Sequence, residues 1–129
     1  MKILLDTCAF LWLIKGETQH LSQAAVTQIL DPENEVFLST ISIWEILLKN
    51  KLNKLPLPEP VYGFVIQQRE AHQIASLEVQ ETDLEVFSKL PDHHRDPFDR
   101  ILICQAIQRQ LRIMTTDTMI KQYPVPILN

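Results

Sequence analysis

Short apolar runs alternate along the chain with longer segments in which apolar residues recur at helical spacing. Strands are predicted at residues 1–5, 36–40, 74–79, 112–117 and 124–128. Helices are predicted at residues 7–15, 22–30, 42–52, 61–71, 82–90 and 97–110, and a further short helix is predicted after residue 117. Because strands alternate with helices throughout, we expect a mostly parallel sheet with helices on both faces, which is a three-layer α/β/α sandwich.

Three helix starts have recognisable capping signals. Ser42 with Glu45, and Thr82 with Glu85, have the spacing of a capping box, in which the two side chains satisfy free backbone N–H groups. Asp96 is a good N-cap because Pro97 follows it at the first helical position. These signals fix the expected beginnings of the helices at 42–52, 82–90 and 97–110.

Length and composition predict one domain spanning residues 1–129. With 46% hydrophobic residues, the chain can build an ordinary core without disulfides or a structural metal. Cys8 and Cys104 lie in apolar segments without zinc-ligand spacing, so we expect buried, reduced thiols in a cytoplasmic protein. The apolar N-terminal run lacks the features of a signal peptide, and no segment is expected to cross a membrane.

Four carboxylates are predicted to lie at one edge of the sheet. Asp6 and Asp117 end strands, whereas Glu45 and Asp99 lie near the starts of helices. The carboxyl ends of parallel strands meet at one edge, where α/β proteins place their chemistry. Four facing carboxylates must raise their pKa values or be neutralised by a cation, and hard oxygen ligands suit Mg²⁺ or Mn²⁺.

Such an ion lowers the pKa of a bound water and polarises a phosphoryl oxygen, so the chemistry fits phosphodiester hydrolysis. The hydroxyls of Thr7 and Thr115 are close enough in sequence to orient a water or a carboxylate. Each acid also has a structural interpretation as a cap or a turn residue. The metal hypothesis rests on all four acids falling at successive strand ends.

A net charge of −4, from 12 basic and 16 acidic residues, gives no overall attraction for nucleic acid. A polyanion would need a local basic patch. Lys49, with Lys51 and Lys54, follows Glu45, and Arg95 and Arg100 flank the two aspartates near residue 97. These lysines could equally favour a helix C-terminus, whereas Arg100 has the better case for substrate contact because it adjoins the expected metal site.

Two further groups have open alternatives. His93 and His94 suit a general acid, although a loop pair of this kind is more often exposed or packed at a helix entry. Trp12 and Trp44 could stack on bases, but core or interface packing suits them better. The apolar residues at 43–48 and 61–66 could form a surface for a partner helix or a second subunit, or pack on the sheet.

The segments LLDTCAFLW, STISIWEILLKNKLNKL, HHRDPFDRILICQAI and RIMTTD occur in the order found in PIN-domain ribonucleases. The chain resembles the VapC-type toxins of bacterial toxin–antitoxin pairs over nearly its whole length, and DPFDR before an apolar helix is the most specific piece. The resemblance implies that Asp6, Glu45, Asp99 and Asp117 bind metal, with Thr115 in support. Asp96 suits a helix cap and is left out of this metal set.

The resemblance also implies endonucleolytic RNA cleavage with one or two Mg²⁺ or Mn²⁺ ions, a homodimer, and inhibition by a small cognate antitoxin. The alternative hypothesis is a catalytically silent PIN-like module that binds RNA or protein. In that case the acids would serve as caps, and Mn²⁺ would not stabilise the protein.

Overall fold

The structure is a computed structural model that describes residues 1–94 and 96–128. Its centre is a parallel five-stranded sheet in the order β3-β2-β1-β4-β5. The strands are β1 (Lys2–Leu5), β2 (Glu35–Ser39), β3 (Ala75–Leu77), β4 (Arg112–Met114) and β5 (Ile127–Leu128). All five lie within predicted strand segments or one residue beyond them, and β5 is an edge strand as predicted.

Helices follow the strands in the predicted alternation. They are α1 (Thr7–Lys15), α2 (Gln23–Leu30), α3 (Thr40–Lys51), α4 (Val61–Ala71), α5 (Glu81–Lys89) and α6 (Pro97–Arg109), with short 3-10 helices η1 (Thr18–His20) and η2 (Ile120–Gln122). The bounds of α1 and α4 match the prediction, whereas η1 was not predicted.

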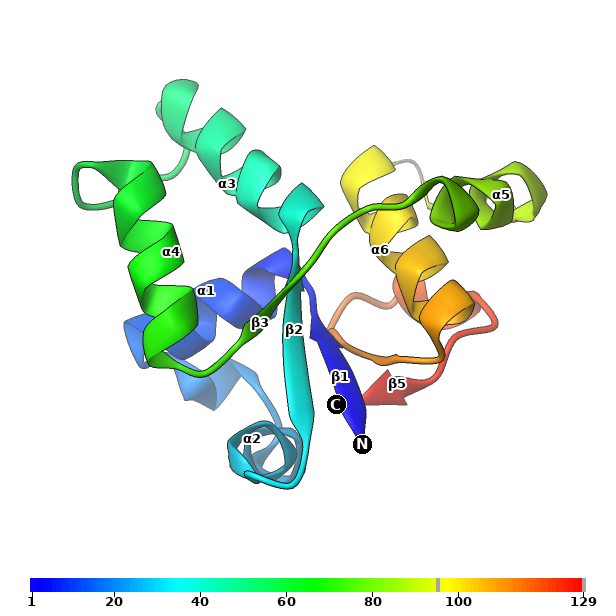
Figure 1. Ribbon diagram of the computed structural model, residues 1–129, viewed down its shortest axis with the longest axis horizontal. Helices are drawn as coiled ribbons and strands as arrows, with labels where there is room; N and C mark the ends of the chain where they lie inside the picture. Colours follow the sequence, from blue (N-terminus) through cyan, green and yellow to red (C-terminus); the bar gives the residue numbers. More distant parts are fainter. Residues whose placement is uncertain (95, 129) are drawn as a thin grey trace.

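The helices cover both faces of the sheet, which confirms the three-layer sandwich (Figure 1). Side chains of a strand alternate between the faces, so Ile3 and Leu5 pack with helices α1 to α4, while Leu4 packs with α6. Both faces of the central strand β1 are therefore buried, which explains its continuous apolar sequence. In the part of the chain described, no helix is both long and apolar enough to cross a membrane.

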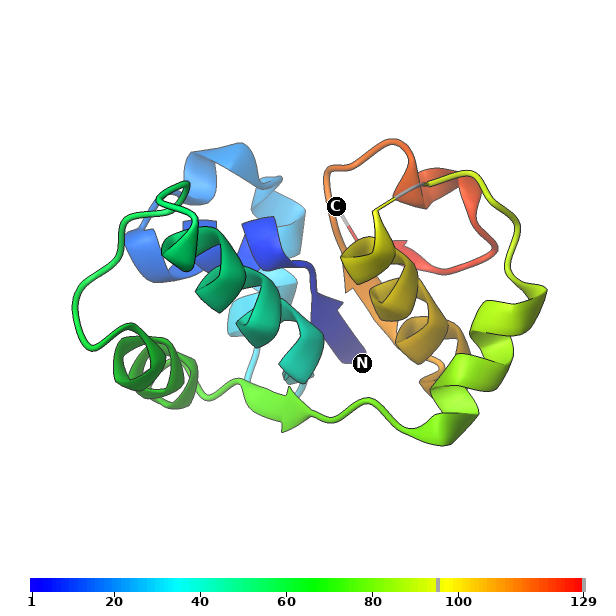
Figure 2. The ribbon, with the colours of Figure 1, turned by 90° about the horizontal axis from the view of Figure 1, so that it is seen from above.

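The strand register brings the ends of three strands to the same level. Leu5 pairs with Leu38 of β2 and with Met114 of β4. The backbone N–H of Asp6 then donates to the carbonyl of Met114 at 3.1 Å. Seen from above, α3 and α6 lie on the two sides of β1 (Figure 2). The residues that follow these strands, and the first turns of these helices, thus surround one edge of the sheet.

Both predicted capping boxes are wrong. Helix α3 begins at Thr40, and its N-cap is Ser39, whose hydroxyl accepts from the N–H of Ile41. Because β2 runs directly into α3, the helix starts two residues before the predicted start, and Ser42 and Glu45 lie inside it. Helix α5 begins after Gln80, whose backbone N–H donates to Asp83 at 2.8 Å.

Candidate metal centre

A cavity of about 130 Å³ lies at the carboxyl edge of the sheet. Its lining comprises Asp6, Thr7, Cys8, Glu45, Lys49, Asp96, Asp99, Thr116 and Asp117. All four predicted acids are therefore brought together, although they come from two strand ends and two helices. Asp96, which was left out of the predicted metal set, lines the same cavity.

Asp6 is fixed by its place between β1 and α1. It is the N-cap of α1, and its Oδ1 accepts from the N–H of Ala9 at 2.8 Å. Burial, with smaller contributions from the negative charges of Asp117 and Glu45, raises the pKa of Asp6 to about 6. Hydrogen bonds from Thr115 and the Ala9 N–H partly oppose this rise. The structural interpretation of Asp6 was that of a strand-end turn residue, and in the structure Asp6 both caps α1 and lines the acidic cavity.

Glu45 reaches the cavity from the second turn of α3, because helical side chains point toward the helix N-terminus. It is only 4% exposed. The hydroxyl of Thr7 donates to its Oε1 at 2.6 Å, and Ser42 Oγ lies 3.0 Å from that hydroxyl. Lys49, one turn later, pairs with Oε2 at 2.8 Å. Glu45 is therefore held through both carboxylate oxygens.

Asp99 projects from the first turn of α6, directly after the cap formed by Asp96 and Pro97. Asp96 Oδ1 accepts from the N–H of Phe98 at 2.9 Å, as predicted for a cap. Burial, together with the charges of Asp96, Glu45 and Asp6, raises the pKa of Asp99 to about 7. These shifts place at least four carboxylates close enough to repel one another in a poorly solvated site.

Asp117 lies three residues beyond β4, and Thr115 lies between them. The buried hydroxyl of Thr115 accepts from the N–H of Asp117 at 3.0 Å, and it also hydrogen-bonds Asp6. One hydroxyl therefore links two of the acids, which agrees with the supporting role expected for Thr115. Asp117 Oδ1 accepts from the N–H of Met119 and so also caps the turn that follows.

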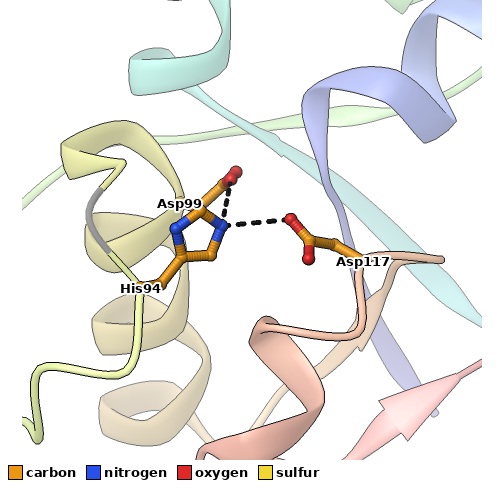
Figure 3. Close-up of side chains that lie close together, drawn as sticks. All are labelled: His94, Asp99 and Asp117. Carbon is orange, nitrogen blue, oxygen red and sulfur yellow. Dashed lines mark hydrogen bonds and ion pairs between the residues drawn. The ribbon is translucent and has the colours of Figure 1, made fainter.

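His94 joins the two acids on the α6 side of the site. Its Nε2 lies 3.1 Å from Asp99 Oδ2 and 3.0 Å from Asp117 Oδ2, as Figure 3 shows. One ligand atom from each of these three residues lies within 4.8 Å of the others. The sequence did not place His94 in the site, because a loop side chain has no periodicity; the usable signal was its position two residues before Asp96.

The predicted basic residues occupy different places. Lys49 lines the cavity, but its ammonium group pairs with Glu45. Arg100 pairs with Asp92 at 2.7 Å and lies over the ring of Phe87 at 4.5 Å, outside the cavity lining. Arg95 lies outside the described residues.

Cys8 and the two tryptophans complete the surroundings of the site. Cys104 is buried as predicted, but the prediction of a buried Cys8 is wrong, because Cys8 is exposed beside the cavity. Although the residue is exposed, partial desolvation of its sulfur and the charge of Asp6 raise the pKa of the Cys8 thiol to about 11. Trp44 packs edge-to-face on Phe98 and is 57% exposed, whereas Trp12 packs against the core and stacks on His20.

The donor set fits a divalent cation. Carboxylate oxygens predominate, and the pKa values of Asp6 and Asp99 are raised, as expected where carboxylates repel one another in a site that suits a cation. Fold and site together define an α/β protein with a carboxylate-lined centre at the carboxyl edge of its sheet. The PIN domain family model matches residues 3–126, so the chain belongs to the PIN domain family.

Solved structures share this fold at low sequence identity. VapBC2 from Rickettsia felis, solved bound to a DNA fragment from its promoter, has a TM-score of 0.72 at 14% identity and covers 100% of this chain and 98% of its own. VapBC-1 from nontypeable Haemophilus influenzae has a TM-score of 0.68 at 15% identity, covering 95% and 91%. FitAcB from Neisseria gonorrhoeae has a TM-score of 0.60 at 21% identity, covering 98% and 96%. No curated protein matches the chain.

Proposed function

We propose that this protein is a Mg²⁺- or Mn²⁺-dependent endoribonuclease that acts as the toxin of a toxin–antitoxin pair. The observation that carries the proposal is the convergence of Asp6, Glu45, Asp99 and Asp117 on one cavity in a PIN domain. Phosphodiester hydrolysis is the reaction that best explains several facing carboxylates in a cytoplasmic protein with no zinc-type ligand spacing.

In this function, the four acids would hold one or two divalent ions, which supply Lewis-acid activation of water and of a phosphoryl oxygen. Thr115 keeps Asp6 and Asp117 in place through its hydroxyl. Thr7 orients Glu45 in the same way.

Substrate binding needs positive charge near an acidic cavity. Inside the cavity, Lys49 is the candidate for binding a phosphate group of the substrate. Its ammonium group would leave Glu45 and contact a phosphate oxygen once bound ions neutralise the acids. Arg100 would contact RNA only at a distance from the acids, since it is engaged by Asp92 and Phe87. Its contribution to binding is therefore expected to be smaller than that of Lys49.

The antitoxin partner is supported by an apolar surface on α3 and α4. Trp44, Leu48 and Leu52 recur every four residues along α3 and are 57%, 37% and 55% exposed, and Tyr62 at the start of α4 is 62% exposed. A stripe of this spacing suits an apolar partner helix, whether from an antitoxin or from a second copy in a homodimer. The related fold of the VapBC complexes agrees with a partner of the first kind.

The test is cleavage of a mixed structured-RNA substrate by the purified, antitoxin-free protein. Cleavage should require Mn²⁺ or Mg²⁺, stop with EDTA, and fall at least about a thousandfold in Asp99→Asn, which is about 4 kcal/mol of barrier. Asp92→Asn is the matched control, because it removes the same charge from an exposed acid outside the cavity. Metal-independent cleavage, or full activity in Asp99→Asn, would contradict the proposal.

One observation favours the second candidate, a catalytically silent binding module. Lys49 and His94 already supply hydrogen-bond donors to three of the acids without any metal. A thermal melt separates the two functions, since an ion that binds only the native state must raise the midpoint. A midpoint unchanged by Mn²⁺ would favour the binding module.

A further inference from the structure

His94 is held by three contacts that fix both its position and its protonation. Its backbone N–H donates to the hydroxyl of Tyr123 at 2.7 Å, which anchors the loop before α6. Its Nδ1 faces the backbone N–H of Asp96 at 3.1 Å. Its Nε2 faces the carboxylates of Asp99 and Asp117 at 3.1 and 3.0 Å (Figure 3).

The contact with Asp96 determines which ring nitrogen carries the proton. A backbone N–H can only donate, so Nδ1 must accept with its lone pair, and the imidazole proton is then on Nε2. Nε2–H therefore points at Asp99 Oδ2 and Asp117 Oδ2 and donates to them. His94 thus gives Asp99 and Asp117 a donor that they share.

The same geometry disfavours His94 as a metal ligand. A ligating Nε2 needs a free lone pair, so its proton would have to move to Nδ1. Nδ1–H would then meet the N–H of Asp96, and two donors would face each other at the start of α6. A ligand role therefore requires the loop to give up a contact that positions it.

We propose that His94 is a positioning residue that closes the metal centre in the metal-free protein, and that a divalent cation enters by displacing its Nε2–H from Asp99 and Asp117. The inference rests on the proposed function, because it concerns the metal centre of that function. Lys49 contacts Glu45 in a similar way, so donors from the chain itself contact the acids on both sides of the cavity. Removing His94 should therefore make cation binding tighter.

The experiment is a calorimetric titration of metal-free protein with MnCl₂ and with MgCl₂. His94→Ala should bind Mn²⁺ roughly tenfold tighter than the wild type, since a hydrogen bond to a charged group no longer has to be broken. His94→Gln should lie between the two, because its amide keeps an N–H donor, and it can replace the alanine variant if that variant fails to fold. His93→Ala is the matched control: His93 packs edge-to-face on Tyr123, and its variant should bind Mn²⁺ as the wild type does.

A melt in EDTA gives a second measurement that does not involve bound metal. His94→Ala should have a lower midpoint than the wild type, since Asp99 and Asp117 lose the donor between them, and Mn²⁺ should raise its midpoint by more than it raises that of the wild type. A variant as stable as the wild type in EDTA would overturn the bridging role.

The remaining outcomes separate this inference from the proposed function. Weaker binding in His94→Ala, with a greater loss for Mn²⁺ than for Mg²⁺, would identify His94 as a ligand and overturn displacement, because imidazole prefers the transition ion. If His94→Ala bound Mn²⁺ with the affinity of the wild type, the displacement of His94 would be overturned, whereas the proposed function would stand. Failure of both proteins to bind either ion would overturn the proposed function, and displacement with it.

Discussion

Asp83 and Asp99 both lie in the first turn of a helix, but Asp83 is fully buried, Asp99 is half-buried, and their surroundings differ. Asp83 in α5 accepts from the guanidinium of Arg109 at 2.9 Å and from the N–H of Gln80 at 2.8 Å. Asp99 in α6 faces three other acids, which with burial raise its pKa to about 7. Its one described donor is the imidazole of His94.

Under the proposed function, this difference separates a structural acid from a functional one. Arg109 supplies a permanent charge, so the Asp83 site is neutral within the chain and stabilises the packing of α5 on α6. The Asp99 site has more carboxylates than cations, so the proposed function adds a cation from outside the chain. Position in the helix alone would have placed both acids in one class.

The largest effect on stability should come from separating the Asp83–Arg109 pair. Asp83→Ala should lower the free energy of unfolding by about 3–5 kcal/mol, because it leaves the guanidinium of Arg109 without its buried partner. Urea titration measures this loss, and cleavage per folded molecule should stay unchanged. A loss below about 1 kcal/mol would mean that the ion pair with Arg109 is not what stabilises the buried carboxylate of Asp83.

The sequence allowed the four acids of the centre to be predicted, because parallel strands end at one edge whatever the details of packing. It misplaced the starts of α3 and α5, because two capping signals competed in each case. Ser39 forms the α3 cap because β2 ends there. In α5, Asp83 accepts from the backbone N–H of Gln80 and also pairs with Arg109.

His94 could not be located in the same way. The sequence offered two adjacent histidines, and only tertiary contacts distinguish them: Tyr123 anchors the backbone of His94, whereas His93 packs on the ring of Tyr123. The exposure of Cys8 has a similar cause. Its neighbours Thr7 and Ala9 are buried, and Cys8 faces the acidic cavity, which the apolar pattern of the segment did not indicate.

The next largest effect should be the pH dependence of metal-free stability. The pKa values of Asp6 and Asp99 rise from 3.8 in unfolded chains to about 6 and about 7 in the fold. Between these limits the native state binds more protons than the unfolded state, so the free energy of unfolding falls by several kcal/mol as pH rises from about 4 to about 8. Urea titrations in EDTA measure this fall.

The same titrations in saturating Mn²⁺ provide the control, since a cation stabilises the ionised carboxylates and should offset the fall at high pH. If the free energy of unfolding without metal rose between pH 5 and pH 7, donors within the chain would be stabilising the ionised carboxylates. The functional class assigned to the Asp99 site would then be wrong.

A smaller effect isolates Asp99 from the other titrating groups. Asp99→Asn should stabilise the metal-free protein at pH 8 by about 1–2 kcal/mol, because it removes the acid that is hardest to ionise and keeps an oxygen for His94. The gain should vanish near pH 3, which is below the pKa of Asp99 in both the folded and the unfolded state. The control is Asp92→Asn, which lies outside the cavity and should give no such gain. A loss of stability in Asp99→Asn would mean that Asp99, like Asp83, is a structural acid.

The smallest effect should come from an ion pair that is not buried. Lys89 and Glu85 lie 3.8 Å apart on α5, with side chains 77% and 72% exposed. Lys89→Ala should change the free energy of unfolding by less than about 0.5 kcal/mol, as measured by urea titration, because water already solvates both charges. A cost as large as that of Asp83→Ala would show that pairing matters wherever it occurs. A negligible cost would show that pairing matters only at sites from which water is excluded, as at Asp83 and Asp99. At such a site a carboxylate needs a positively charged partner, which comes either from the chain or from solution.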